Sequence, residues 1–205
     1  MRKRYLIAPL CLAVVITAGL IFHSLFPSTA DTTNGTTKQV RHMNINRSIS
    51  TVEDAYCSAA FAAICTVEKK HPSAENWWES QQISTDFTLR ILRTTNPDEG
   101  AVGDTVRMRM RGGETDDAIL TVSDSHPDKL EEGQTYLILF SEPTSFDPEN
   151  PVYLPLGADN GIFLQTDTKD DRSWRSLHGN WSIDASTLVP TDAGDTPLLS
   201  LFSEP

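Results

Sequence analysis

The chain has 205 residues, with 17 lysines and arginines against 28 aspartates and glutamates and a formal net charge of −11. Such an acidic chain is repelled by phosphate backbones, which excludes unspecific binding to nucleic acid, and its three cysteines are too few for a disulfide-stapled scaffold. Residues 113–205 hold 18 acidic and four basic side chains, so the excess negative charge lies in the second half.

The amino end predicts a membrane segment. Three basic residues at positions 2–4 precede an uncharged, apolar run over residues 5–26. As a helix with a rise of 1.5 Å per residue, that run would span about 33 Å, enough to cross a hydrocarbon layer of roughly 30 Å. The basic residues favour a cytoplasmic stub over residues 1–4. We therefore expect a single-pass protein of the cell membrane with its C-terminal domain outside.

The residues after the apolar run leave a second outcome open. Ser28, Thr29 and Ala30 place small side chains where a signal peptidase cleaves, and cleavage after Ala30 would release a secreted protein. The length of the run favours retention as an anchor instead. Residues 27–50 are rich in threonine, asparagine and serine and have no apolar period, so they predict a flexible linker to a domain over residues 51–205.

Short strands dominate the predicted elements of this domain. Thr51, followed by two acidic residues, predicts a helix to about residue 58. The alternating patterns predict strands at 59–68, 83–93, 105–111, 118–122, 134–141 and 181–183, and a hairpin from 152–156 and 161–166. Residues 167–180 look irregular. Pro197 after Thr196 predicts a final helix that docks on the domain.

Two segments indicate how the core is arranged. The run from Tyr136 to Phe140 is apolar at every position, which is typical of a central strand buried on both faces. In 105–111 the apolar residues alternate with Arg107, Arg109 and Arg111. Pairing of this strand with 83–93 would place Arg90 on the same outward face.

This row of four arginines is the first candidate site. An anionic glycan, an envelope polymer or an acidic surface protein can dock on such a face. The alternative is that the arginines pair with the acidic second half of the chain itself, where each exposed pair is worth about 0 to 1 kcal/mol.

Two further pairs of residues are candidates for weaker roles. Trp77 and Trp78 lie in a predicted loop over 69–82, either as binding anchors or folded back onto the domain. Cys57 and Cys65 can meet in an oxidising compartment. A strand that contains Cys65 and starts after Cys57 argues against a disulfide between them, although it stays an alternative.

Three segments resemble a known family. The residues Ala55-Tyr56-Cys57-Ser58-Ala59-Ala60, Thr88-Leu89-Arg90-Ile91-Leu92-Arg93 and Gly133-Gln134-Thr135-Tyr136-Leu137-Ile138-Leu139-Phe140 together are similar to the netrin-like domain of tissue inhibitors of metalloproteinases and of exported bacterial proteins. The resemblance implies a mainly β fold, an OB-type barrel with short flanking helices. Inhibitors of that family chelate the protease zinc through an amino-terminal cysteine, and Cys57 lies too far inside this chain for that mechanism.

No pattern in the sequence predicts catalysis, a metal site or a cofactor. Asp124, Ser125 and His126 are neighbours in one loop, which does not suit a catalytic triad. The histidines at 71, 126 and 178 lack the spacing of zinc ligands, and the aspartates at 159, 167, 170 and 171 lack that of a calcium loop. We therefore expect a membrane-tethered extracytoplasmic binding or interaction module that is not an enzyme. The alternative is a secreted protease inhibitor or enzyme.

Overall fold

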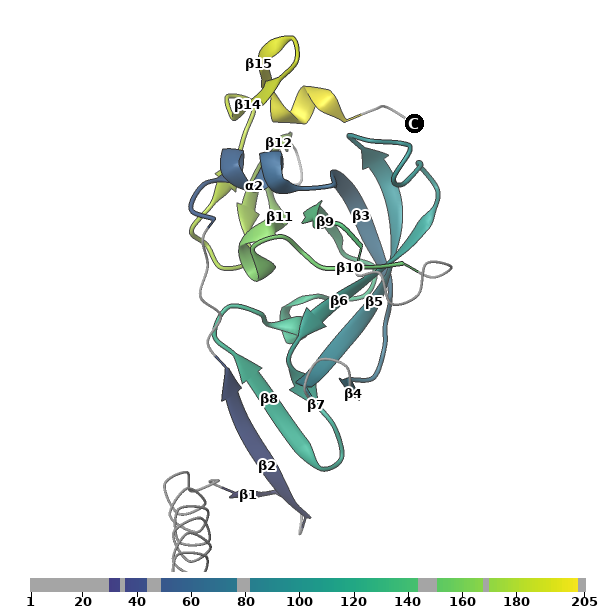
Figure 1. Ribbon diagram of the computed structural model, residues 1–205, viewed down its shortest axis with the longest axis vertical. Coiled ribbons are helices and arrows are strands. Elements are labelled where there is room, and N and C mark those ends of the chain that lie inside the picture. Colours follow the sequence, from purple (N-terminus) through teal and green to yellow (C-terminus); the bar gives the residue numbers. More distant parts are fainter. Residues whose placement is uncertain are drawn as a thin grey trace, which may run out of the picture.

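The structure, a computed structural model, describes the residues 30–33, 36–43, 49–76, 82–143, 151–167 and 170–202. The predicted cytoplasmic stub, the membrane segment over 5–26, and Trp77 and Trp78 lie outside these described residues. Among the helices that the structure describes, none is long and apolar enough to cross a bilayer. The prediction of a mainly β fold is confirmed (Figure 1).

One large sheet organises the molecule. Its strands are, in sheet order, β10 (Val152–Tyr153), β6 (Thr105–Arg111), β5 (Gln82–Thr94), β3 (Phe61–Lys70), β9 (Thr135–Phe140), β11 (Ile162–Asp167), β12 (Asp170–Ser176) and β13 (Ser182–Ile183). The short strand β4 (Ala74–Asn76) pairs with β5 beside them. Except for the parallel pair of β10 and β6, neighbouring strands are antiparallel.

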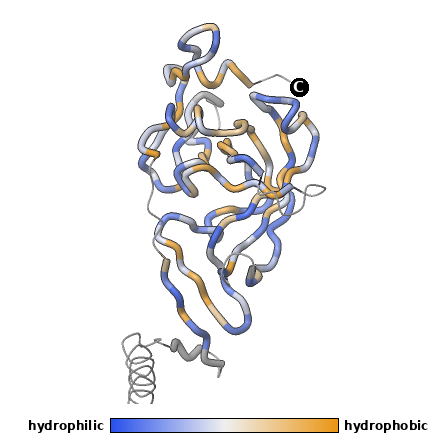
Figure 2. Tube along the Cα trace, in the orientation of Figure 1, coloured by the Kyte–Doolittle hydropathy of each residue, from blue (hydrophilic) through white to orange (hydrophobic). Residues whose placement is uncertain are grey.

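Strand β9 separates two hydrophobic cores, as its uninterrupted apolar run predicts. Tyr136, Ile138 and Phe140 belong to a first core that also includes alternate residues of β3, β5 and β6. Leu137 and Leu139 belong to a second core on the opposite face of the sheet. Successive side chains of a strand point to opposite faces, so a strand covered on both faces must be apolar at every position. In Figure 2 the tube is orange where β9 runs through the middle of the body.

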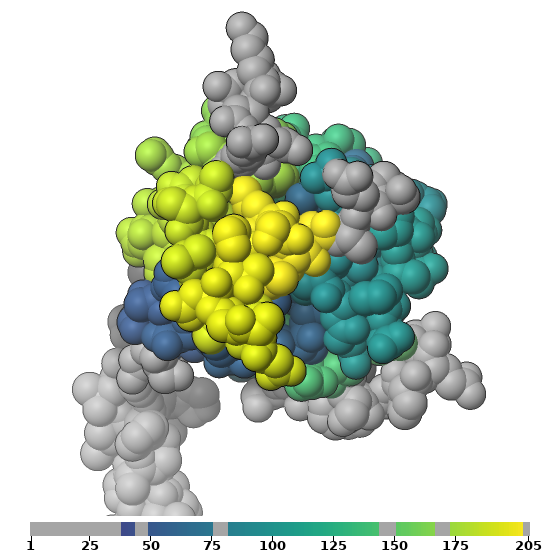
Figure 3. All heavy atoms as spheres, turned by 90° about the horizontal axis from the view of Figure 1, so that it is seen from above, coloured from purple at the N-terminus to yellow at the C-terminus, as the bar shows by residue number. Residues whose placement is uncertain are grey.

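The second core is covered by α2 and the C-terminal segment. The helix α2 (Val52–Ser58) begins at Thr51, whose Oγ1 accepts a hydrogen bond of 3.1 Å from the Asp54 N–H, as the predicted N-cap requires. The hairpin of β14 (Leu188–Thr191) and β15 (Gly194–Pro197) leads into the 3₁₀ turn η4 (Leu198–Leu201). Figure 3 looks onto this end, where the C-terminal segment (yellow) lies beside α2 (blue).

The expected final helix is therefore only a single short turn. Thr196 does not cap a helix, because it pairs with Val189 in the β14–β15 hairpin. The predicted docking is nevertheless present, since Leu198 and Phe202 are buried in the second core. The apolar pattern of this segment predicted its burial correctly but not its backbone conformation.

The strand ladders of the described residues do not join into a closed ring. β10 and β9 do not pair as strands. The segment after β10 meets β9 through one isolated bridge between Phe140 and Pro155 and two flanking hydrogen bonds, Ser141 N–H to Leu154 O at 2.9 Å and Leu156 N–H to Leu139 O at 2.8 Å. Pro155 has no N–H with which to extend a strand ladder, so this contact between β9 and the segment after β10 stays short.

The predicted hairpin at 152–166 is wrong. Its first half, β10, pairs with β6, and Tyr153 packs edge-on against Phe61 and Phe140 at centroid distances of 5.3 and 5.8 Å. Its second half, β11, pairs with β9 and β12. Between them lies the 3₁₀ turn η3 (Ala158–Gly161), where a Cβ on Gly161 would lie 1.9 Å from Leu156 O. The hairpin prediction failed because the contacts of Tyr153 with Phe61 and Phe140 join distant parts of the chain, which the local turn pattern could not indicate.

The predicted irregular segment 167–180 also contains a strand, β12. Trp174 in β12 is buried in the second core, and Arg175 next to it is exposed. Trp174 is the only large apolar residue in the sequence of β12, so the segment shows no alternation of apolar and polar residues from which a strand could be predicted. The short strand expected at 181–183 is present as β13 and pairs with β12.

The predicted linker contains strands. β1 (Ala30–Thr33) pairs with β2 (Thr36–Met43), and β2 pairs in parallel with β8 (Ala118–Val122), which also pairs with β7 (Gly113–Glu114). Ion pairs of Lys38 with Glu114 at 2.5 Å and of Arg41 with Glu75 at 3.3 Å accompany this pairing. These partners lie far along the chain, so the local composition of 27–50 could not reveal the strand.

Both cysteines of the domain are free thiols, so the candidate disulfide is not formed. Cys65 is buried in the first core on β3, and burial raises the pKa of its thiol well above the ordinary value. Cys57 is exposed on α2. A bond between them would have to draw Cys65 out of the first core.

Candidate functional site

The structure places all four predicted arginines on one face of β5 and β6. The register pairs Arg90 with Thr105, Thr88 with Arg107, and Asp86 with Arg109. Paired residues of neighbouring strands point to the same side, so Arg90, Arg107, Arg109 and Arg111 share the side opposite the first core. We call these four residues the arginine face. The predicted inward side chains Val106, Met108 and Met110 are buried.

Arg109 differs from the prediction of an outward, exposed side chain. It is only 8 % exposed, and its guanidinium donates to both carboxylate oxygens of Asp86, at 2.7 and 3.0 Å. Arg107 donates to the same carboxylate, with Nη2 2.6 Å from Asp86 Oδ2, but half of its side chain remains exposed. Asp86 thus lies between two arginines, one buried and one at the surface.

The ionisation of Asp86 follows from this arrangement. Burial alone would raise the pKa of its carboxyl, but the hydrogen bonds and charges of Arg109 and Arg107 outweigh burial and hold the pKa below its ordinary value. Asp86 is therefore ionised at neutral pH, and its charge is shared by two guanidinium groups.

The other two arginines lie at the edges of the face. Arg90 is exposed, forms a salt bridge through Nε with Glu68 Oε1, and donates through Nη1 to Gly103 O at 2.9 Å. No described residue forms a salt bridge with the Arg111 side chain. The salt-bridge partners of this face among the described residues, Asp86 and Glu68, both belong to the first half of the chain.

A second group of polar side chains was not predicted as a site. Asp159 on η3 is 0 % exposed, and its carboxylate accepts from the His126 backbone N–H at 2.9 Å and lies 2.6 Å from His126 Nδ1. Lys129 Nζ is 3.7 Å from the same carboxylate. The Asp159 N–H donates in turn to Asp124 O at 3.1 Å. These contacts clamp the loop after β8 to η3.

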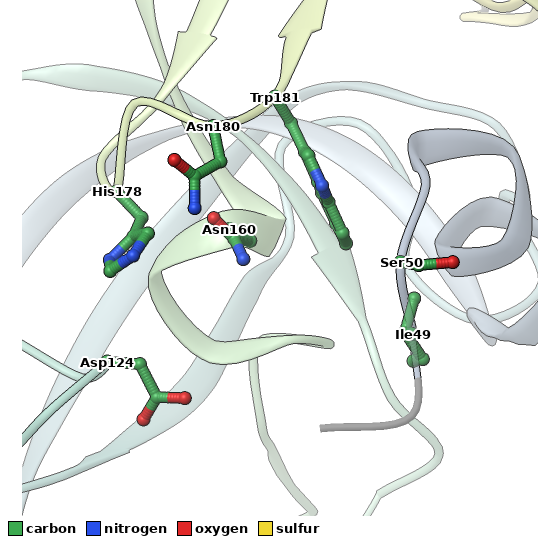
Figure 4. A pocket seen from close by; sticks show the side chains of 7 residues that line it. All are labelled: Ile49, Ser50, Asp124, Asn160, His178, Asn180 and Trp181. Carbon is green, nitrogen blue, oxygen red and sulfur yellow. The ribbon is translucent and has the colours of Figure 1, made fainter. Parts of the chain in front are cut away.

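A polar pocket of about 490 Å³ lies beside this clamp (Figure 4). We call it the Asn160 pocket, and its lining residues are Ile49, Ser50, Asp124, Asn160, His178, Asn180 and Trp181. They come from the segment before α2, the loop after β8, η3 and the turn between β12 and β13. Asp124 is a neighbour of Ser125 and His126 in the chain, but the three side chains do not form a catalytic triad. Ser125 Oγ instead donates to Arg111 O at 2.7 Å.

The sequence carries little signal for this pocket, because its residues converge from four segments between positions 49 and 181. Among the described residues no group of three or more histidine, cysteine or acidic side chains could hold a metal ion. Comparisons of the chain with protein-family models, curated proteins and solved structures found no match.

Proposed function

We propose that the chain is a membrane-tethered binding module whose β domain works outside the cell membrane and holds an anionic envelope polymer on the arginine face. The observation that carries this proposal is the gathering of four arginines on one face, in a chain whose net charge is −11. Two of them keep about half of their side chain exposed, 47 % for Arg90 and 50 % for Arg107.

The arrangement suits a rigid platform for a polyanion. Arg109 is held by two hydrogen bonds to Asp86, and Asp86 in turn fixes Arg107, whose side chain is 50 % exposed. A guanidinium that is already oriented loses less conformational freedom when it binds a carboxylate or phosphate. Arg107 is therefore the residue of this face that is best prepared to contact a ligand.

Replacing Arg107 by glutamine is expected to weaken binding of the full-length chain, in detergent, to immobilised polygalacturonate by about two- to fivefold, the usual worth of one exposed charge pair. Arg175→Gln is the matched control, since Arg175 is an exposed arginine on β12 and its loss changes the net charge equally. Arg109→Glu is unsuitable, because it would bury like charges beside Asp86. Equal binding by the Arg107 and Arg175 variants, or equal retention of the wild type on neutral dextran, would contradict the proposal.

We also propose that the sheet is an OB-type barrel with one incompletely paired seam, in the manner of the netrin-like domain that the sequence resembles. OB-type barrels have five strands and are partly open. In support, β6, β5, β3 and β9 are consecutive neighbours, β10 pairs with β6, and the Phe140–Pro155 bridge lies between β10 and β9. The first core fills the space that these strands surround.

A further inference from the structure

The Asn160 pocket contains a buried polar atom that no described residue satisfies. Asn160 is 8 % exposed, and its Oδ1 is buried without a hydrogen-bond partner among the described residues. A buried acceptor left without a donor costs about 1–3 kcal/mol. In Figure 4 the amides of Asn160 and Asn180 point toward one another, with His178 to one side and Trp181 to the other. A ligand that donates to Oδ1 would remove this cost.

The walls of the pocket are held in place by hydrogen bonds and packing contacts within the protein. Ser176 Oγ accepts from the N–H groups of Gly179 and Trp181, both at 3.1 Å, which holds the turn that carries His178 and Asn180. The Trp181 ring lies over Gly157, the residue before η3, where an added Cβ would lie 3.5 Å from the ring. The contacts of the Asp159 carboxylate with the His126 backbone N–H and Nδ1 hold the opposite wall. The site is therefore largely formed before a ligand arrives.

We infer that the Asn160 pocket binds a neutral sugar ring. The lining combines one carboxylate (Asp124), two amides (Asn160 and Asn180), one imidazole (His178) and one indole (Trp181). A hydroxyl group both donates and accepts, so a sugar matches a lining that alternates acceptors and donors. The flat indole offers an apolar surface to the C–H face of the ring.

The charge of the lining selects this ligand class over two others. None of the lining residues is a lysine or an arginine, so an anionic group would find no opposite charge among them. Only one of the lining residues, Asp124, is acidic, so the lining offers a metal cation a single carboxylate ligand, which is too few. The pocket shares no residue with the arginine face, so this inference goes beyond the polyanion binding proposed above and stands or falls separately.

Titration calorimetry of the full-length chain with cellotriose, chitotriose and maltotriose tests the inference. A polyoxyethylene detergent is required, because glycoside detergents would compete. We expect saturable binding of at least one trisaccharide, and at least about a tenfold loss of affinity in Asn160→Leu, the usual effect of removing a hydrogen bond to a buried group. The same variant should be at least as stable as the wild type in urea, because leucine has a similar shape and removes the unsatisfied oxygen.

Two further variants complete the experiment. Asn180→Ala, at an exposed position, should lower the affinity several-fold without affecting folding. Gln134→Leu removes an exposed amide outside the pocket and should change neither property. Absence of binding to all three sugars would overturn the inference. So would unchanged affinity in Asn160→Leu, or a loss of affinity accompanied by a loss of stability, since the latter indicates a structural role for Asn160. Binding of polygalacturonate by Asn160→Leu should stay at the wild-type level.

Discussion

Replacing Asp86 by alanine is expected to lower the free energy of unfolding by about 3–5 kcal/mol, because it removes the carboxylate that accepts two hydrogen bonds from the buried Arg109 guanidinium. Arg109 is 8 % exposed and Asp86 is 7 % exposed, so water cannot take over the lost contacts. The two hydrogen bonds of 2.7 and 3.0 Å are lost together. Urea-induced unfolding of the two proteins, followed by tryptophan fluorescence, measures the difference.

Glu68→Ala is the matched control for this prediction. It removes the carboxylate from the exposed Glu68–Arg90 pair, so its cost should be about 0–1 kcal/mol. The double change Asp86→Leu with Arg109→Met should recover most of the stability, since replacing a buried ion pair by apolar groups is often neutral. If Asp86→Ala and Glu68→Ala lower the free energy of unfolding by similar amounts, the Asp86–Arg109 pair is not a buried ion pair.

The same carboxylate gives the unfolding free energy a pH dependence. Since the native pKa of Asp86 is held below the unfolded value of about 3.9, its contribution is present above that pH and is lost as the pH falls through the native pKa. The wild type should therefore lose more stability than Asp86→Ala when the pH is lowered below about 4. Parallel pH profiles of the two proteins would contradict this assignment.

Replacing Asp159 by alanine is expected to cost about 2–3 kcal/mol, because the His126 backbone N–H loses its acceptor while it stays partly buried. Asp159 has no solvent exposure and joins the loop after β8 to η3 through His126 at 2.9 and 2.6 Å. Urea unfolding measures the cost. Faster hydrogen exchange at the His126 amide in the variant than in the wild type would assign this cost to the loss of the His126–Asp159 hydrogen bond.

Asp128→Ala provides the comparison for this second prediction. Asp128 is exposed in the 3₁₀ turn η2 (Pro127–Lys129), only two residues from His126, and its replacement should change the stability by less than about 0.5 kcal/mol. If both alanine variants unfold at the same urea concentration, the clamp between the loop and η3 does not contribute to stability.

Predictions from the sequence succeeded where the determining pattern is local. Alternation in 105–111 and the apolar run of Tyr136 to Phe140 specify strands and their buried faces, because the period of a strand depends only on neighbouring residues. The shared side of the four arginines followed from strand pairing. Thr51 correctly predicted the start of α2, since an N-cap acts within one turn.

Predictions failed where partners from distant segments determine the structure. Arg109 looks like its neighbours in the sequence, but it is buried against the cross-strand partner Asp86, which lies 23 residues away in the chain. Strand β2 pairs with β8, about 80 residues further along the chain, so residues 36–43 alone read as a linker. The Asn160 pocket combines residues between 49 and 181, and none of its segments is distinctive alone. Long-range contacts of this kind leave no period in the sequence.

The proposed function places the β domain outside the cell membrane, and one measurement tests this directly. An epitope tag after Pro205 is followed in intact spheroplasts treated with a protease that cannot cross the bilayer. We expect the tag to be degraded without lysis and the untreated protein to stay with the membrane after an alkaline carbonate wash. A tag that is protected until the spheroplasts are lysed would place the domain in the cytosol and contradict the proposed function.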